Sequence, residues 1–247
     1  MRVARIFCPE VVMHSNTFSL STELSHYLIK VLRHKVKHKV ILFNNDDGYE
    51  YLAEICDANP KSVTVNISTK YLIERESILD IHLFQSLSKG DKLETVIQKA
   101  TELGVKHITP IITQRVDYKL SLERINTKLE HWQKIAISAS EQSGRVFIPK
   151  INPPIIFSQA LNLTVELKLL LSPYAIHHVQ ALKQQYPKVS QFNIYIGPEG
   201  GFSEDELKLA SHHDCQSIAL GQRILRTETA PIATIAILQA LWGDFNK

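Results

Sequence analysis

Apolar residues in the first seventy positions follow a pattern that is typical of β-strands. Short alternating or β-branched runs, which suit strands with one buried face, occur at 2–7, 39–45, 49–55 and 62–68. The sequence Asn-Asp-Asp-Gly at 45–48 predicts a hairpin turn between the middle two runs. One helix is expected at about 22–33. The pattern therefore predicts a small barrel-like β-domain over residues 1–70.

The pattern changes after a polar, charged stretch at 71–78, which we interpret as a linker. Apolar strand-like runs follow at 81–87, 105–112, 167–172, 192–197 and 217–220. Helical periodicity separates them, at about 91–104, 121–142, 176–185, 203–213 and beyond residue 231. Strands that are apolar throughout and alternate with helices indicate a mostly parallel sheet covered on both faces. Residues 79–247 are thus expected to form an α/β domain.

Two of these helices begin with the sequence of a capping box. In a capping box the side chain of the N-cap residue accepts a hydrogen bond from the backbone N–H of a glutamate three residues later, and the glutamate side chain accepts one from the backbone N–H of the N-cap residue. The pairs are Asp91 with Glu94 and Ser203 with Glu206. Gly104 is expected to end the first of the two helices, because glycine tolerates the left-handed conformation found there.

Glycine is concentrated in one stretch, IGPEGGFSEDE at 196–206. Three of the nine glycines in the chain lie there, namely Gly197, Gly200 and Gly201. The stretch follows an apolar strand and precedes a helix, at the edge of an open α/β sheet where ligands bind. It matches neither a P-loop nor a dinucleotide-binding pattern. Two interpretations stay open, a tight turn without a ligand or a loop whose backbone approaches one closely.

A second stretch, LGQRILRTETAP at 220–231, has the same setting. A short strand ends near Gly221, and a helix follows that tolerates Pro231 in its first turn. A third strand ends at Ser172. We expect the three strand ends to form one pocket of backbone donors and acceptors with apolar walls, as small-molecule sites usually have.

Composition excludes several classes of protein. Hydrophobic residues make up 44% of the 247 residues and charged residues 21%, as in ordinary globular proteins. We find no signal peptide and no run long enough to span a membrane, so we expect a cytoplasmic protein without a membrane partner. The three cysteines form no CxxC pair, and the histidines at 177–178 and 212–213 lack ligand spacing. We therefore expect no metal.

Positive charge is concentrated near the N-terminus. The net charge of +3 does not by itself identify a nucleic-acid partner. No acidic residue occurs from Leu24 to Asn45, however, and His26, Lys30 and Arg33 share one face of the expected helix. This basic stretch is either a solvated surface or a patch that contacts phosphates.

The stretches GPEGGFSEDE and LGQRILRTETA resemble signature segments of the RsmE family of ribosomal RNA methyltransferases, in the SPOUT superfamily. HYLIKVLR at 26–33, KATELGV at 99–105 and EQSGR at 141–145 also resemble that family, in the same order. The resemblance implies a PUA-like RNA-binding domain, then a SPOUT-type methyltransferase domain whose chain end forms a trefoil knot, and a homodimer. One departure is Lys37-His38, where the family usually has glycine-aspartate.

The resemblance also implies a reaction, the S-adenosylmethionine-dependent methylation of N3 of a uridine in small-subunit (16S) ribosomal RNA, free or in the assembled subunit. Cofactor contacts carried over from the family fall on Leu171, Ser172, Ile196, Gly197, Pro198, Gly201, Leu220, Gly221, Ile224, Leu225 and Thr227. RNA contacts are expected at Arg2, Arg5, His26, Lys30, Arg33, Lys35 and Arg145.

For catalysis we expect Arg226 to stabilise the uridine anion, since a fixed cation favours the charge on O2 and O4. Glu228 accepts the proton or orients Arg226. Arg223 and Arg145 are reserve candidates for the cation, and Arg226 has the alternative of a structural ion pair. Glu199 either contacts the base or pairs with a cation beside the following helix.

Two other functions stay open: a non-catalytic RNA-binding or ribosome-assembly protein that keeps the fold, and a nucleotide-using α/β enzyme without an RNA partner. The intact stretch at 220–231 favours the methyltransferase over the first alternative. The basic stretch favours an RNA partner over the second.

Overall fold

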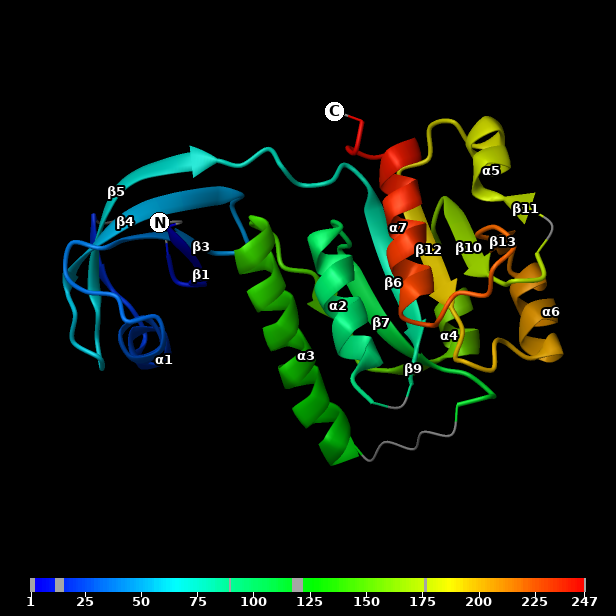
Figure 1. Ribbon diagram of the computed structural model, residues 1–247, viewed down its shortest axis with the longest axis horizontal. Helices are drawn as coiled ribbons and strands as arrows, with labels where there is room; N and C mark the ends of the chain where they lie inside the picture. Colours follow the sequence, from blue (N-terminus) through cyan, green and yellow to red (C-terminus); the bar gives the residue numbers. More distant parts are fainter. Residues whose placement is uncertain (1–2, 12–15, 89, 117–121, 176, 247) are drawn as a thin grey trace. The chain divides into compact units, whose positions relative to one another are not determined.

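The chain folds into two compact units (Figure 1). The computed structural model describes residues 3–11, 16–88, 90–116, 122–175 and 177–246. The first unit comprises residues 1–76 and 140–148, and the second comprises 77–139 and 149–247. The apolar pattern did not indicate that 140–148 belongs to the first unit. Domain limits at 70 and 78 stay a prediction.

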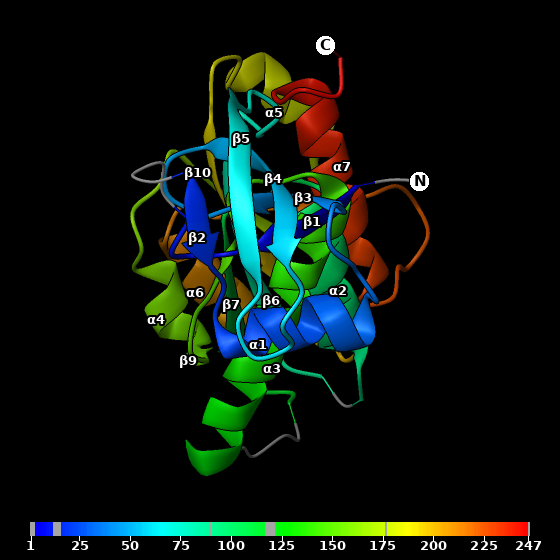
Figure 2. The ribbon, with the colours of Figure 1, turned by 90° about the vertical axis from the view of Figure 1, so that its left-hand side faces the viewer.

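The first unit contains a five-stranded sheet, with strands in the order β1-β3-β4-β5-β2 (Figure 2). The strands are β1 (Ala4–Phe7), β2 (Thr17–Ser19), β3 (Lys39–Phe43), β4 (Tyr49–Asp57) and β5 (Thr64–Leu72). Strand β1 pairs in parallel with β3, and the other pairs are antiparallel. This mixed pairing joins the chain's first strand to the predicted hairpin of β3 and β4.

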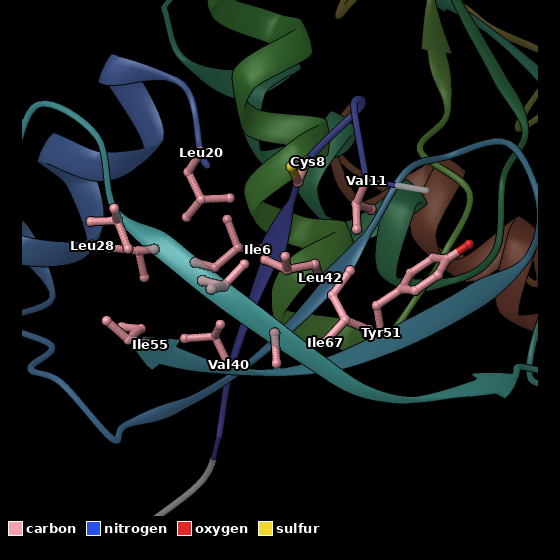
Figure 3. Packing of buried hydrophobic residues seen from close by; sticks show 13 residues of the cluster. Ile6, Cys8, Val11, Leu20, Leu28, Val40, Leu42, Tyr51, Ile55 and Ile67 are labelled. Carbon is pink, nitrogen blue, oxygen red and sulfur yellow. The ribbon is translucent and has the colours of Figure 1, made fainter. Parts of the chain in front are cut away.

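The core of this unit comes from the strand positions that face inward (Figure 3). Val40 and Leu42 alternate on β3, and Tyr51 and Ile55 lie on the same face of β4, all of them buried. Helix α1 (Thr22–His26) continues into a π-helical turn, η1 (Tyr27–Val31). Leu28 from this turn completes the core. The basic residues of the same segment are therefore left on the exposed side.

The guanidinium of Arg5 holds segment 140–148 in the first unit. It donates to the backbone oxygens of Ser140, Glu141 and Arg145 at 2.9, 3.0 and 3.0 Å, and to the Glu50 carboxylate at 2.8 Å. The first two oxygens belong to the last turn of α3 (Leu122–Ser143), where carbonyls lack helical partners and the helix dipole favours a cation. Arg5 thus caps α3.

The Arg145 side chain also forms contacts within the first unit. Its Nε donates to Glu76 at 3.0 Å, and only 6% of the Arg145 side chain is exposed. The same carboxylate accepts the backbone N–H groups of Val146 and Phe147. Arg145 and Glu76 therefore fix the path of the chain after α3.

The second unit contains an eight-stranded sheet in which every described pairing is parallel. Its order is β11-β13-β10-β12-β6-β7-β8, and β9 also pairs with β7. The strands are β6 (Asp80–Ser86), β7 (His107–Ile112), β8 (Lys150–Ile151), β9 (Ile155–Ile156), β10 (Leu167–Leu171), β11 (His177–His178), β12 (Gln191–Ile196) and β13 (Gln216–Ala219). The predicted parallel α/β fold is confirmed.

Helices cover both faces of this sheet (Figure 1). They are α2 (Lys92–Glu102), α3, α4 (Phe157–Leu161), α5 (Val179–Gln185), α6 (Glu204–His212) and α7 (Thr229–Leu241). Helix α7 packs on α2 and α5, and α4 packs on α6. Phe84 and Tyr195 stack on one sheet face under Phe157 and Phe202. No described helix is long and apolar enough to cross a membrane.

The two predicted capping boxes differ in outcome. At α6, Glu206 N donates to Ser203 Oγ at 3.1 Å and Ser203 N donates to Glu206 Oε2 at 2.8 Å, so the box forms. At α2, Asp91 makes no side-chain capping bond, so that prediction is wrong. Its ψ of 14° departs from the extended geometry that lets an N-cap side chain reach back. Gly104, at φ +88°, ends α2 as predicted.

We predict that Ser203→Ala lowers the free energy of unfolding by about 1 kcal/mol, because the Glu206 N–H loses its acceptor. Asp91→Ala is the matched control at a helix start in the same unit, with an expected change within about 0.5 kcal/mol. Urea unfolding followed by circular dichroism measures both. Equal losses in the two variants would contradict the assignment of the capping bonds.

Candidate functional site

A cavity of about 800 Å³ lies in the second unit at the carboxyl ends of three adjoining parallel strands. The strands are β12, β10 and β13, and the segments that follow them, 171–174, 196–202 and 220–227, form most of the wall. This volume is in the range of small-molecule sites, at about 300–1,000 Å³. The expected meeting of Ser172, Gly197 and Gly221 is therefore found.

All eleven residues predicted to contact a cofactor line this cavity: Leu171, Ser172, Ile196, Gly197, Pro198, Gly201, Leu220, Gly221, Ile224, Leu225 and Thr227. Arg226 and the reserve candidate Arg223 also line it, whereas Glu228 begins the adjoining helix as the N-cap of α7. Whether these residues bind a cofactor stays a prediction. The fold brings them together at one edge of one sheet.

Glycine is required at two positions of the glycine-rich stretch for different physical reasons. Gly201 has φ +67°, a left-handed conformation that disfavours other residues. A Cβ at Gly197 would lie 3.2 Å from the ring of Phe202, which packs beneath the loop. The interpretation as a tight turn is therefore sound, and it is compatible with a ligand because the turn itself lines the cavity.

A chain of hydrogen bonds ties the strand ends together beneath the cavity. Gln85, at the end of β6, donates from Nε2 to Thr227 Oγ1 at 3.0 Å, and Thr227 Oγ1 donates to the Gly197 carbonyl at 2.9 Å. Gln85 is only 1% exposed, and its Oε1 is a buried atom without a partner among the described residues. Sequence reasoning missed Gln85, although a glutamine inside the largely apolar run IHLFQSL was the available signal.

Charged side chains from separate segments gather at the cavity. Lys92 Nζ, at the start of α2, lies 2.6 Å from Glu199 Oε1. Its hydrogen bond with Glu199 raises the pKa of Lys92, the charge of Glu228 adds to this effect, and Arg226 opposes it. The structure therefore pairs Glu199 with a cation, one of the two roles considered for it. The motif-based search missed Lys92.

Arg226 is not held by a strong ion pair. Its Nη1 lies 3.9 Å from Glu228 Oε1, and its side chain is 85% exposed. Such exposed pairs contribute little to stability, so a purely structural role for Arg226 has little support. Glu228 Oε2 is buried and has no partner among the described residues. The site thus combines an exposed cation with a buried acceptor atom that has no hydrogen-bond partner in the described part of the chain.

The loop after β7 steadies the glycine-rich stretch. Arg115 Nη1 donates to the Gly200 carbonyl at 2.6 Å, and Gln114 N donates to Glu206 Oε1 at 2.8 Å. Arg115 lines the cavity but was not predicted, because it lies in no recognised motif. Its position just after a parallel strand was the only signal.

The predicted RNA contacts lie in the first unit and fall into two groups. His26, Lys30, Arg33 and Lys35 are exposed. Arg5 and Arg145 are buried in the contacts described above. Arg2 lies outside the described residues. The exposed group remains available for phosphates, whereas the buried pair has a structural task.

The loop that carries part of the exposed group has a defined conformation. Arg33 and Lys37 adopt left-handed φ values of 55° and 70°. His34 Nδ1 and His38 Nδ1 lie 3.1 Å apart and share a hydrogen bond. The departure from glycine-aspartate at Lys37-His38 is therefore accommodated within an ordered turn.

A parallel α/β unit with a ligand-sized cavity at three strand ends, together with a small β-unit, defines a two-unit α/β protein with a small-molecule site. The family model described as "RNA methyltransferase domain" matches residues 75–239, and that described as "RNA methyltransferase PUA domain" matches 20–68. The chain belongs to this RNA methyltransferase family. The predicted family and fold class, a PUA-like β-domain before a SPOUT-type α/β domain, are thereby confirmed.

Curated relatives match more than nine-tenths of the chain. Ribosomal RNA small subunit methyltransferase E from Buchnera aphidicola subsp. Schizaphis graminum is 37% identical, with 99% of each chain covered. The Bacillus subtilis protein of the same name is 32% identical, with 92% of this chain and 93% of the relative covered.

Solved structures agree with this assignment. A Legionella pneumophila protein with bound S-adenosylmethionine has a TM-score of 0.92 at 38% identity, with 99% of this chain and 100% of that chain covered. Ribosomal RNA small subunit methyltransferase E from Neisseria gonorrhoeae, also bound to S-adenosylmethionine, has a TM-score of 0.90 at 34% identity, with the same coverage.

We predict that Thr227→Val destabilises the second unit by about 1–3 kcal/mol, because the buried Gln85 amide and the Gly197 carbonyl lose their shared partner. Thr229→Val makes the same change at an exposed position two residues later, with an expected effect within about 0.5 kcal/mol. Thermal unfolding compares the two. A Thr227 variant as stable as the Thr229 variant would show that the hydrogen-bond chain is not important for stability.

Proposed function

We propose that the protein transfers a methyl group from S-adenosylmethionine to N3 of a uridine in small-subunit (16S) ribosomal RNA. The observation that carries this proposal is the cavity, since eleven residues predicted from the family motifs line it. Relatives named for this activity on small-subunit ribosomal RNA, and full-length structural neighbours with bound S-adenosylmethionine, support it.

The cavity suits the cofactor chemically. Leu171, Leu220 and Leu225 supply apolar surface of the kind that an adenine ring needs. A Cβ built at Gly201 or Gly221 meets no atom within 4 Å, so these backbone segments border open space. When bound, S-adenosylmethionine supplies an electrophilic methyl group. The chain's part is to hold it, exclude water and position the nucleophile.

The acceptor nitrogen has to lose a proton, because neutral uridine carries one on N3. We assign its removal to Glu228, whose Oε2 is buried without a partner among the described residues. The charge that develops spreads to O2 and O4, where the Arg226 guanidinium stabilises it as an oxyanion donor does. Arg226 is free to approach a substrate because it is 85% exposed. Arg223, which also lines the cavity, is the reserve cation.

RNA binding is assigned to the PUA-like unit. Its exposed His26, Lys30, Arg33 and Lys35 follow one another from the end of α1 through η1 into the next turn, where they can contact successive phosphates. We propose that Arg2 also contacts the RNA. Arg5 and Arg145 act indirectly, because they hold segment 140–148 in that unit.

Further parts of the proposal come from the family resemblance. They are a trefoil knot formed by the chain end, a homodimer with α7 at the interface, a cytoplasmic location, and domains at 1–70 and 79–247 joined by a linker at 71–78. Helix α7 supports the dimer, because apolar residues such as Ile232, Ile237 and Leu241 remain partly exposed on it. The substrate is the free RNA or the assembled small subunit.

Arg226→Ala is expected to slow single-turnover methylation about 100-fold at saturating cofactor and RNA, because an oxyanion donor is lost. Arg226→Lys should recover part of the rate, since it keeps the charge but not the planar fork. Arg124→Ala, an exposed arginine of α3 that does not line the cavity, is the control. Wild-type rates in both Arg226 variants would rule out the assigned role.

Calorimetry with S-adenosylmethionine accompanies these assays. Binding by the wild-type protein supports a methyltransferase, whereas no binding would favour the non-catalytic RNA-binding alternative. The Arg226 variants are expected to keep the wild-type cofactor affinity, because the proposed role of Arg226 concerns the substrate.

We predict that Lys30→Ala weakens binding to small-subunit RNA fragments and lowers the slope of log K against log salt by about 1, because one phosphate contact is lost. Lys61→Ala, an exposed lysine of the same unit outside the basic stretch, is expected to leave the slope unchanged. Filter binding across a salt series measures both. Identical slopes for the wild-type protein and the two variants would remove η1 from the RNA interface.

A further inference from the structure

Lys92 occupies a fixed position at the cavity. It is the first residue of α2, just after the strand end that carries Gln85, and its side chain lines the cavity. Leu93, Val96 and Ile97 anchor the helix in the core, since all three are buried. The start of α2 is thus set by core packing, and the Lys92 ammonium projects from a rigid base.

The ion pair of Lys92 is of a kind that can exchange partners. Nζ lies 2.6 Å from Glu199 Oε1, but the two side chains are 38% and 50% exposed. Pairs this exposed contribute little to the stability of a fold. Lys99 and Glu102, in the last turn of α2, form a comparable pair at 2.8 Å that does not line the cavity. Of these two pairs, the Lys92 pair is the one that lies where a ligand could compete for the ammonium.

Two cations and a carboxylate lie near one another here. The charges of both Arg226 and Glu228 act on Lys92. Arg226 and Glu228 are themselves paired loosely at 3.9 Å, and Glu228 Oε2 still lacks a donor among the described residues. The cluster therefore places two positive groups at the cavity, and one buried acceptor atom at the start of the adjoining helix α7.

The pairing edge of uracil has the complementary pattern. It presents an acceptor, O2, then a donor, N3–H, and then a second acceptor, O4. Two cations opposite the oxygens and a carboxylate opposite N3–H match all three groups. Cytosine does not match, because it offers a bare N3 and a donor amino group in place of O4. A site whose polar groups are set to bond one base rejects another base that leaves those groups unpaired.

We propose that Lys92 is a catalytic residue that leaves Glu199 to bind one carbonyl oxygen of the target uracil, while Arg226 binds the other. This proposal rests on the proposed function. In the step, the N3–H proton passes to Glu228 and the N3 electron pair forms the new N–CH₃ bond. The pair of the breaking C–S bond stays on sulfur, which yields neutral S-adenosylhomocysteine. Lys92 stabilises the negative charge on the oxygen while N3 reacts.

The test is single-turnover methylation of small ribosomal subunits at saturating S-adenosylmethionine, with Lys92→Met, Lys92→Arg and the matched control Lys99→Met. Lys92→Met is expected to slow the step about 100-fold, as the loss of an oxyanion donor does. Lys92→Arg should recover most of the rate because it keeps a cation. Lys99→Met should keep the wild-type rate, and all three variants should keep the wild-type cofactor affinity in calorimetry.

A second RNA substrate shows whether the defect of Lys92→Met comes from lost stabilisation of the uridine anion or from a change in the structure of the protein. RNA with 5-fluorouridine at the target position loses its N3 proton more readily, so the difference between Lys92→Met and wild-type protein should shrink on that RNA. A Lys92→Met rate equal to that of Lys99→Met, or a defect of the same size on both RNAs, overturns the proposal. A wild-type protein that methylates neither RNA contradicts the proposed function itself.

Discussion

Everything at the site depends on the parallel pairing of β13, β10, β12 and β6, because strands that run the same way end at the same edge. The hydrogen bonds from Gln85 through Thr227 to Gly197 then lock three of the chain's segments at that edge. Without this register, stretches that lie far apart in sequence would not form one cavity. The glycines refine the arrangement, since Gly201 permits the turn and Gly197 leaves room for Phe202.

The same edge explains why charge gathers there. Backbone and apolar groups at the ends of β10, β12 and β13 provide a neutral lining, while Lys92, Glu199, Arg226 and Glu228 come from the segments around it. In the proposed reaction the neutral part holds the methyl donor and the charged part selects and activates uracil. The first unit provides a separate surface, where Arg5 and Arg145 maintain the structure and Lys30 and its neighbours stay exposed.

Sequence reasoning recovered the features that have a period or a motif. Apolar strands, the Ser203 capping box and the eleven motif residues that line the cavity all fall into this group. It missed β2, β8, β9 and α4, which have only two to five residues and thus no measurable period. It also placed a capping bond at Asp91, where the backbone angles prevent one.

Other features depend on contacts that only the fold creates. The capping of α3 by Arg5, at a separation of 135 residues from Ser140, has no local sequence signal. Lys92 and Arg115 contact the glycine-rich loop from outside any motif. For this reason two arginines that looked like RNA contacts proved to be buried in the first unit, whereas a lysine without a motif proved to line the cavity.

The central claim is that this cavity holds a methyl donor for uridine N3. In the most direct measurement, the purified protein is incubated with small subunits from cells that lack it and with S-adenosylmethionine that carries an isotopically labelled methyl group. Mass spectrometry of the ribosomal RNA then locates the label. The account predicts the label at N3 of one uridine. Label on another base or another atom, or its absence from the RNA, would contradict it.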